Sequence, residues 1–121
     1  MKDKISRQLK EIIFRYGVSV CDEPKRLKSL LKDLCPNSPR ENFVLLTVVR
    51  QDIINELLEI KGDYKFKSTR LKNKVVNNCG IESKLANWAV DSWAYALGII
   101  DEVIKQEKES SEQIRADAKK I

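Results

Sequence analysis

Apolar residues recur at helical spacing along most of the chain. Near the N-terminus they stand three or four positions apart, which places them on one face of a helix. They are Ile5, Leu9, Ile12, Ile13 and Tyr16. We expect Gly17 to end this first helix. A second helix is predicted to begin at Pro24, because proline is tolerated in the first helical turn, and to end before Pro36. Its single apolar stripe consists of Leu27, Leu30, Leu31 and Leu34.

The clearest local signal precedes the third predicted helix. Ser38 can accept a hydrogen bond from the third amide of the helix while Glu41 reaches back to the capping amide, and Pro39 takes the first position. The residues that follow, 43–49, are apolar on all sides. They predict either a central buried helix or a lone β-strand, and periodicity alone does not choose. We favour the helix, because the sequence contains no second strand-like run for pairing.

The middle of the chain predicts two further helices separated by a loop. Residues 53–60 continue the helical pattern, with Asp52 as a possible cap. Residues 61–67 are predicted to form the loop. The next helix is predicted to begin at the Ser-Thr pair 68–69 and to end with Gly80 in the left-handed conformation.

The last long helix is predicted to begin near Ser83 and carries both tryptophans. Mostly small residues follow the centre of one face, which permits a close helix crossing; they are Leu85, Ala89, Ser92 and Ala96. Trp88 and Trp93 stand about 140° apart around the axis, wider than a typical apolar stripe. We predict that Trp93 is buried, and that Trp88 lies at the rim and contacts a partner together with Tyr95. The stripe resumes beyond Gly98, so the pattern allows the helix to continue there, at the cost of an interior glycine.

Length and composition fit one folded domain. A chain of 121 residues with 42% hydrophobic and 34% charged residues can bury a substantial core. The predicted fold is all-α, a compact bundle of five or six helices over residues 1–104. Residues 105–121 are polar and predict a linker or helical tail. The sequence has no apolar run near the roughly 20 residues of a membrane span and no signal segment, which predicts a cytoplasmic protein without a membrane partner.

Groups suited to catalysis are sparse. The chain has no histidine, which excludes Ser-His and Cys-His nucleophiles and removes the imidazole ligands of many metal sites. The three cysteines, Cys21, Cys35 and Cys79, are far apart in sequence and are predicted to be reduced and structural. Asp91 falls on the polar side of its helix, so we expect it to be solvated and not to act as a general acid or base. The sequence predicts no catalytic, cofactor or metal site.

The charge distribution supports an alternative function. The net charge is +5, and residues 1–40 carry ten Lys or Arg against five Asp or Glu, whereas residues 81–121 carry six against eight. Residues 61–74 hold six Lys or Arg and one acid, interleaved with Tyr64 and Phe66. This mixture can bind a phosphate backbone and stack a base, although a loop of this kind can also fold its aromatic rings back onto the core. The candidate nucleic-acid contacts are Lys65, Lys67, Arg70, Lys72 and Lys74.

Three stretches carry a family resemblance: residues 13–17 (Ile-Phe-Arg-Tyr-Gly), 26–36 (Arg-Leu-Lys-Ser-Leu-Leu-Lys-Asp-Leu-Cys-Pro) and 80–98, with its two tryptophans. Together they resemble a small helical module attached to kinase-like, chaperone-like or sulfatase-modifying-type effector domains in bacterial multidomain proteins. The resemblance spans about residues 5–100 and rests on leucines, tryptophans and turn residues. It implies an accessory role with a protein partner or fused effector domain, and transfers no active site. The chain departs from the pattern in lacking an effector domain, which could be joined at the polar tail. The leading prediction is a non-enzymatic protein–protein interaction or adaptor module.

Overall fold

The computed structural model of the protein describes residues 2–100, which form six α-helices, one 3-10 helix and no strand. The elements are α1 (Lys2–Tyr16), η1 (Val18–Asp22), α2 (Pro24–Leu34), α3 (Pro39–Arg50), α4 (Ile53–Leu58), α5 (Tyr64–Cys79) and α6 (Ser83–Ala96). The predicted all-α bundle is confirmed over this range, and residues 43–49 are helical as expected. The predicted tail, residues 105–121, lies outside the described residues.

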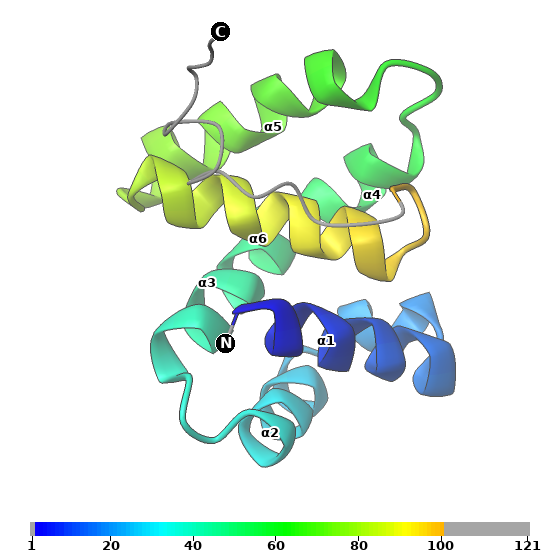
Figure 1. Ribbon diagram of the computed structural model, residues 1–121, viewed down its shortest axis with the longest axis vertical. Helices are drawn as coiled ribbons and strands as arrows, with labels where there is room; N and C mark the ends of the chain where they lie inside the picture. The colour runs from blue at the N-terminus through cyan, green and yellow to red at the C-terminus, as the bar shows by residue number, and fades with distance from the viewer. Residues whose placement is uncertain (1, 101–121) are drawn as a thin grey trace, which may run out of the picture.

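Helix α6 is the centre of the bundle. It packs against α1, α3 and α5, and Figure 1 shows it between α5 on one side and α1 on the other. Ten of its 14 residues are buried. The sequence predicted residues 43–49 of α3 at the centre, and most of them are buried, but the Phe43 side chain is exposed. The central position predicted for residues 43–49 is therefore shared with the tryptophan helix.

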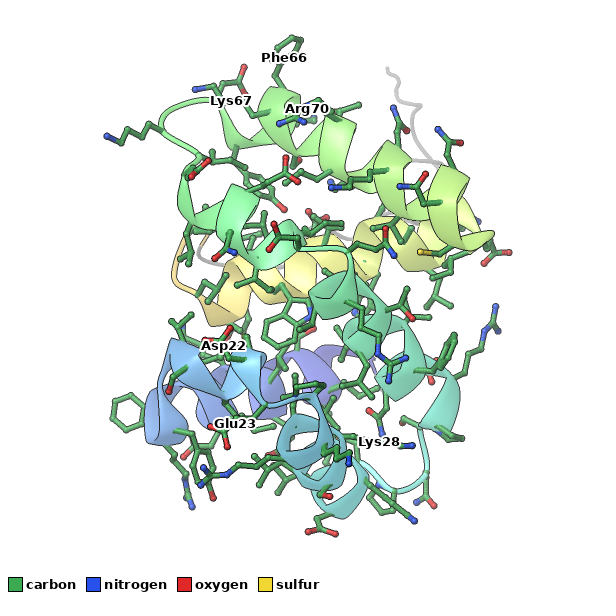
Figure 2. The ribbon with its side chains drawn as sticks, turned by 180° about the vertical axis from the view of Figure 1, so that it is seen from behind. Asp22, Glu23, Lys28, Phe66, Lys67 and Arg70 are labelled. Carbon is green, nitrogen blue, oxygen red and sulfur yellow. The ribbon has the colours of Figure 1, made fainter. Side chains whose placement is uncertain are left out.

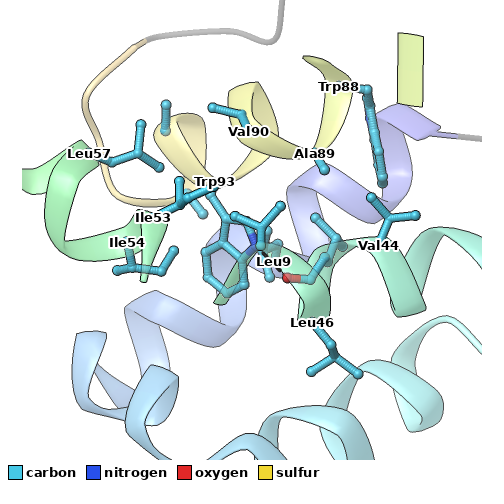
Figure 3. Close-up of a cluster of buried hydrophobic side chains, with 14 of the residues drawn as sticks. Leu9, Val44, Leu46, Ile53, Ile54, Leu57, Trp88, Ala89, Val90 and Trp93 are labelled. Atoms are coloured by element: carbon cyan, nitrogen blue, oxygen red, sulfur yellow. Dashed lines mark hydrogen bonds between the residues drawn. The ribbon is translucent and has the colours of Figure 1, made fainter. Parts of the chain in front are cut away.

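Two buried polar contacts fix how α6 crosses its neighbours. The hydroxyl oxygens of Ser6 in α1 and Ser92 in α6 lie 2.9 Å apart. The indole Nε1 of Trp93 donates to the carbonyl oxygen of Leu45 in α3 over 3.0 Å, as the dashed line in Figure 3 shows. Ala89, one of the small residues along the centre of this face of α6, is fully buried.

Glycines with a positive φ angle end three helices. Gly17 (φ 80°) follows α1 and Gly80 (φ 65°) follows α5, both as predicted. Gly98 (φ 82°) lies just beyond α6, where the amide of Ile99 donates to the carbonyl of Ala94 over 2.8 Å and that of Gly98 to Tyr95 over 3.1 Å. This pair of bonds forms a Schellman motif. The helix therefore ends before Gly98, and the continuation that the sequence allowed does not form.

The start of α3 follows the predicted position but not the predicted hydrogen bonds. Ser38 is the N-cap and Pro39 opens the helix, yet the Ser38 side chain makes no capping hydrogen bond. Asn42, one turn into α3, holds the preceding turn instead. Its amide nitrogen donates to the carbonyls of Cys35 over 2.9 Å and Leu31 over 3.3 Å. The link between α2 and α3 therefore depends on a side chain that capping rules do not identify.

Helix α5 begins earlier than the sequence predicted. Its N-cap is Asp63, whose carboxylate accepts from the amide of Phe66 over 3.1 Å, so most of the expected loop over 61–67 is helical. Tyr64 is buried in the core, whereas Phe66 points away from the protein. Of the two aromatic rings that the sequence allowed either to stack a base or to cover the core, Tyr64 covers the core and Phe66 does not.

Candidate functional site

A buried polar cluster joins α5 to α6 around Asp91. The Asp91 carboxylate is 0% exposed, and its Oδ1 accepts from the Lys72 ammonium over 2.9 Å and from the Tyr64 hydroxyl over 2.5 Å. The prediction that Asp91 is solvated is therefore wrong. The helical wheel assumed one buried face, but α5 covers the side of α6 on which Asp91 stands.

The Asp91 carboxylate is buried together with groups that stabilise its charge. A buried carboxylate is stabilised only if other groups replace the water it has lost, and Lys72 and Tyr64 do so here. Burial, the Asp91 charge and the hydrogen bond to Asp91 raise the pKa of Tyr64 well above its ordinary value, so the phenol remains a donor. Because the carboxylate is wholly shielded, a substrate could reach it only if α5 moved away. The arrangement serves to hold two helices together.

A groove of about 800 Å³ lies between α4 and α5. We call it the α4–α5 groove. One wall comes from α4 and the two residues after it, and the other from one face of α5. The lining residues are Glu56, Glu59, Ile60, Phe66, Lys67, Thr69, Arg70, Leu71, Asn73, Lys74 and Asn77. In Figure 2, Phe66, Lys67 and Arg70 stand together at one end of the protein.

One carboxylate neutralises two of the cations in the groove. Glu56 in α4 accepts from the Lys74 ammonium over 3.0 Å and pairs with the Arg70 guanidinium over 3.2 Å. The hydrogen bond from Lys74, aided by the charges of both cations, holds the pKa of Glu56 below its ordinary value. The Lys67 ammonium donates to the backbone carbonyl of Lys61. These contacts tie α4 and the following turn to α5.

The structure does not place all five residues predicted to contact nucleic acid on one surface. Lys72 is mostly buried against Asp91, and Arg70 and Lys74 are paired with Glu56. Lys65 and Lys67 are exposed on either side of Phe66. The five cations therefore do not form one continuous basic surface.

The predicted partner contacts Trp88 and Tyr95 do not form an exposed surface. Trp93 is 0% exposed, as predicted, but Trp88 is only 5% exposed, so its expected place at the rim is wrong. Figure 3 shows both indoles pointing from α6 into the protein. Tyr95 is half-buried, and the Lys10 ammonium lies 4.4 Å from its ring centroid. With three helices packed around α6, both flanks that carry a tryptophan are covered.

The cysteines lie in packed surroundings. Cys35 is buried, and Cys21 and Cys79 are partly buried. Burial, with a smaller effect from Asp22, raises the pKa of the Cys21 thiol to about 11, and burial also raises the pKa of Cys35. The thiols of Cys21 and Cys35 are therefore weak nucleophiles. Across the described residues, no three His, Cys, Asp or Glu side chains are grouped to hold a metal ion.

Sequence reasoning identified Phe66 and the cations of α5 but not the groove that they line. Lys67, Arg70 and Lys74 stand at i, i+3 and i+7, a spacing that places them on one helical face. That signal was obscured because the helix was expected to begin at 68–69. The opposite wall, with Glu56, comes from another helix, and no sequence pattern brings the two together.

No family model, curated protein or solved structure was found to match the chain. The resemblance to effector-associated helical modules therefore stays a prediction. None of the helices within residues 2–100 has the length and apolar character that crossing a membrane requires.

Proposed function

We propose that the protein is a non-enzymatic interaction module, an adaptor that binds a partner protein or serves an attached effector domain. The observation that carries this proposal is Phe66, whose side chain is 76% exposed at the α4–α5 groove. Binding sites are usually concave surfaces that combine apolar lining with a few polar groups, and the groove combines Phe66, Ile60 and Leu71 with charged side chains. Aromatic residues are also enriched among the anchors of protein interfaces.

The composition of the groove favours a protein over a nucleic acid. Glu56 and Glu59 line it alongside the cations, and carboxylates oppose a phosphate backbone. Ile60 and Leu71 add apolar lining. A protein segment can match apolar, acidic and basic positions at once, because its side chains differ from one position to the next.

Nucleic-acid binding is the second candidate. The exposed ring of Phe66 between Lys65 and Lys67 favours it, because a base can stack on an aromatic ring while lysines contact the phosphates. Three of the five candidate cations are already paired with carboxylates, which weakens this alternative.

Affinity capture with matched variants tests the proposal. The unmodified chain, Phe66→Ala and Phe14→Ala are immobilised and exposed to cell extract at two ionic strengths. Phe14 is a suitable control, because it is an 85% exposed phenylalanine on a different helix, α1. We expect protein retained by the unmodified chain and Phe14→Ala, lost with Phe66→Ala and unaffected by nuclease.

Two results would contradict this function. Equal retention by all three chains would show that the groove is not the binding site. Nuclease-sensitive retention that weakens steeply as salt rises would support the nucleic-acid alternative, since phosphate contacts depend strongly on salt.

A further inference from the structure

We propose that the α4–α5 groove binds an amphipathic helix of a partner protein that carries acidic residues beside its apolar stripe. This inference rests on the proposed function and specifies the chemistry of the partner.

The cations of α5 can form further hydrogen bonds beyond those that they make within the protein. Lys67, Arg70 and Lys74 line the groove from one face of the helix, and Glu56 contacts the last two. The Arg70 side chain is 77% exposed. A guanidinium has five N–H donors in a fork that matches a carboxylate. Arg70 can therefore receive a second carboxylate while it remains paired with Glu56, and exposed Lys67 lies one turn away.

The apolar part of the groove lies beside these cations. Leu71 is buried, Ile60 is half-buried and Phe66 is exposed, and all three line the groove. An apolar stripe laid between α4 and α5 would cover Ile60 and remove the Phe66 ring from water. Acidic residues along one edge of that stripe would then face Lys67 and Arg70.

A helix fits this site better than an extended strand or a nucleic acid. Strand addition requires an exposed sheet edge with free backbone groups, and both walls of the groove are helical or follow directly from a helix. The lining extends along α5 from Phe66 to Asn77, roughly 16 Å at 1.5 Å per residue, which matches about three helical turns. Glu59 lies within the groove and opposes a phosphate backbone. The site therefore suits a helix with apolar anchors at i, i+3 or i+4, and i+7.

Binding of defined peptide pools tests this inference. Three fluorescein-labelled pools of helical peptides, each about five turns long, share apolar positions randomised among Leu, Ile, Phe and Met. One pool has glutamates beside the stripe, one has lysines there, and one has the acidic composition with a scrambled stripe. We expect fluorescence anisotropy to show that the full chain binds the acidic pool at least about tenfold more tightly than the other two, a difference of about 1.4 kcal/mol.

Charge reversal provides the second readout. In Lys67→Glu/Arg70→Glu the preference should shift from the acidic pool to the lysine pool. Lys28→Glu/Lys32→Glu, with two exposed lysines of α2, should retain the preference of the unmodified chain. Circular dichroism confirms that both variants are folded before binding is compared.

Three outcomes would overturn the inference: no binding of any pool, equal binding of the acidic and scrambled pools, or an acidic preference that survives charge reversal in the groove. A labelled single-stranded oligonucleotide that binds more tightly than every pool would also overturn it. If Phe66-dependent protein capture succeeds while the peptide preference is absent, the partner chemistry is wrong and the interaction function stands. If capture fails, the function itself is contradicted.

Discussion

The surroundings of single residues in this domain are determined by neighbours that lie far away in sequence. Asp91 stands between two tryptophans on a helix whose period suggests a solvated position. It is instead enclosed by Tyr64 and Lys72 from α5. Asn42 likewise has no pattern that marks it, yet it supports the turn between α2 and α3. Local rules identify helix ends, but not the polar side chains that cross between helices.

The buried pair of Lys72 and Asp91 gives a prediction about the stability of the folded protein. Lys72→Met removes the ammonium and leaves the Asp91 carboxylate buried without its counter-charge. We expect the free energy of unfolding at neutral pH to fall by about 3–5 kcal/mol, as for other broken buried pairs. Chemical denaturation measures the change.

The matched control is the double variant Lys72→Met/Asp91→Leu, which replaces both charges with apolar groups of similar size. It should recover most of the lost stability. A Lys72→Met variant as stable as the unmodified chain would show that the pair contributes nothing to holding α5 on α6.

At the scale of the elements, glycine and proline made most helix boundaries predictable because they act through local backbone geometry. Gly17, Gly80 and Pro24 mark boundaries where the sequence placed them. The start of α5 was predicted too late in the chain, because no local pattern shows that Tyr64 is buried against Asp91. The sequence does not decide the end of α6, because a glycine within an apolar stripe can be either interior or terminal.

The sign of the stability change on substituting Gly98 distinguishes a glycine at the end of the helix from one in its interior. At φ +82° an alanine is strained even though its Cβ would meet nothing within 4 Å, so Gly98→Ala should destabilise the protein by about 1–2 kcal/mol. Thermal unfolding measures this change. In the interior of a continuing helix, the same substitution would stabilise the protein by about 1 kcal/mol, and that result would contradict the Schellman motif.

The two tryptophans of α6 differ in hydrogen bonding and not in burial. Trp93 Nε1 donates to the Leu45 carbonyl, whereas Trp88 Nε1 has no hydrogen-bond partner among the described residues. Replacing either indole with phenylalanine leaves a similar void, but only Trp93→Phe removes a hydrogen bond. We expect Trp93→Phe to cost about 1–2 kcal/mol more than Trp88→Phe in chemical denaturation. Equal losses of stability would show that the hydrogen bond from Trp93 to the Leu45 carbonyl does not stabilise the protein.

At the scale of the whole molecule, the sequence predicted the helical class but not which surface remains available. The all-α bundle follows from apolar periodicity along most of the chain. The central place of α6 and the groove between α4 and α5 depend on how helices pack, and no periodicity specifies that packing. The exposed Phe66 could not be distinguished from the buried Tyr64, because both are aromatic residues among lysines.

The link between α4 and α5 gives a pH-dependent prediction. The pKa of Glu56 is lowered in the folded protein by Lys74 and Arg70, from an ordinary value of 4.5. Its contribution to stability is therefore complete above pH 4.5 and is lost as the pH falls through the lowered folded-state value. Glu56→Gln should be less stable than the unmodified chain at neutral pH, and the difference should disappear in strong acid. A difference that does not change with pH would contradict this role for the Glu56 carboxylate.

Photocrosslinking from position 66 shows whether the α4–α5 groove is the site at which the protein binds a partner. A benzophenone amino acid replaces Phe66 in one chain and Phe14 in another, and each chain is irradiated in cell extract. An interaction module with its binding site at the α4–α5 groove predicts a discrete, protease-sensitive adduct from position 66, displaced by the acidic peptide pool and absent from position 14. Adducts of equal yield from both positions, or an adduct at position 66 that nuclease removes and protease does not, would contradict a protein-binding site at the groove.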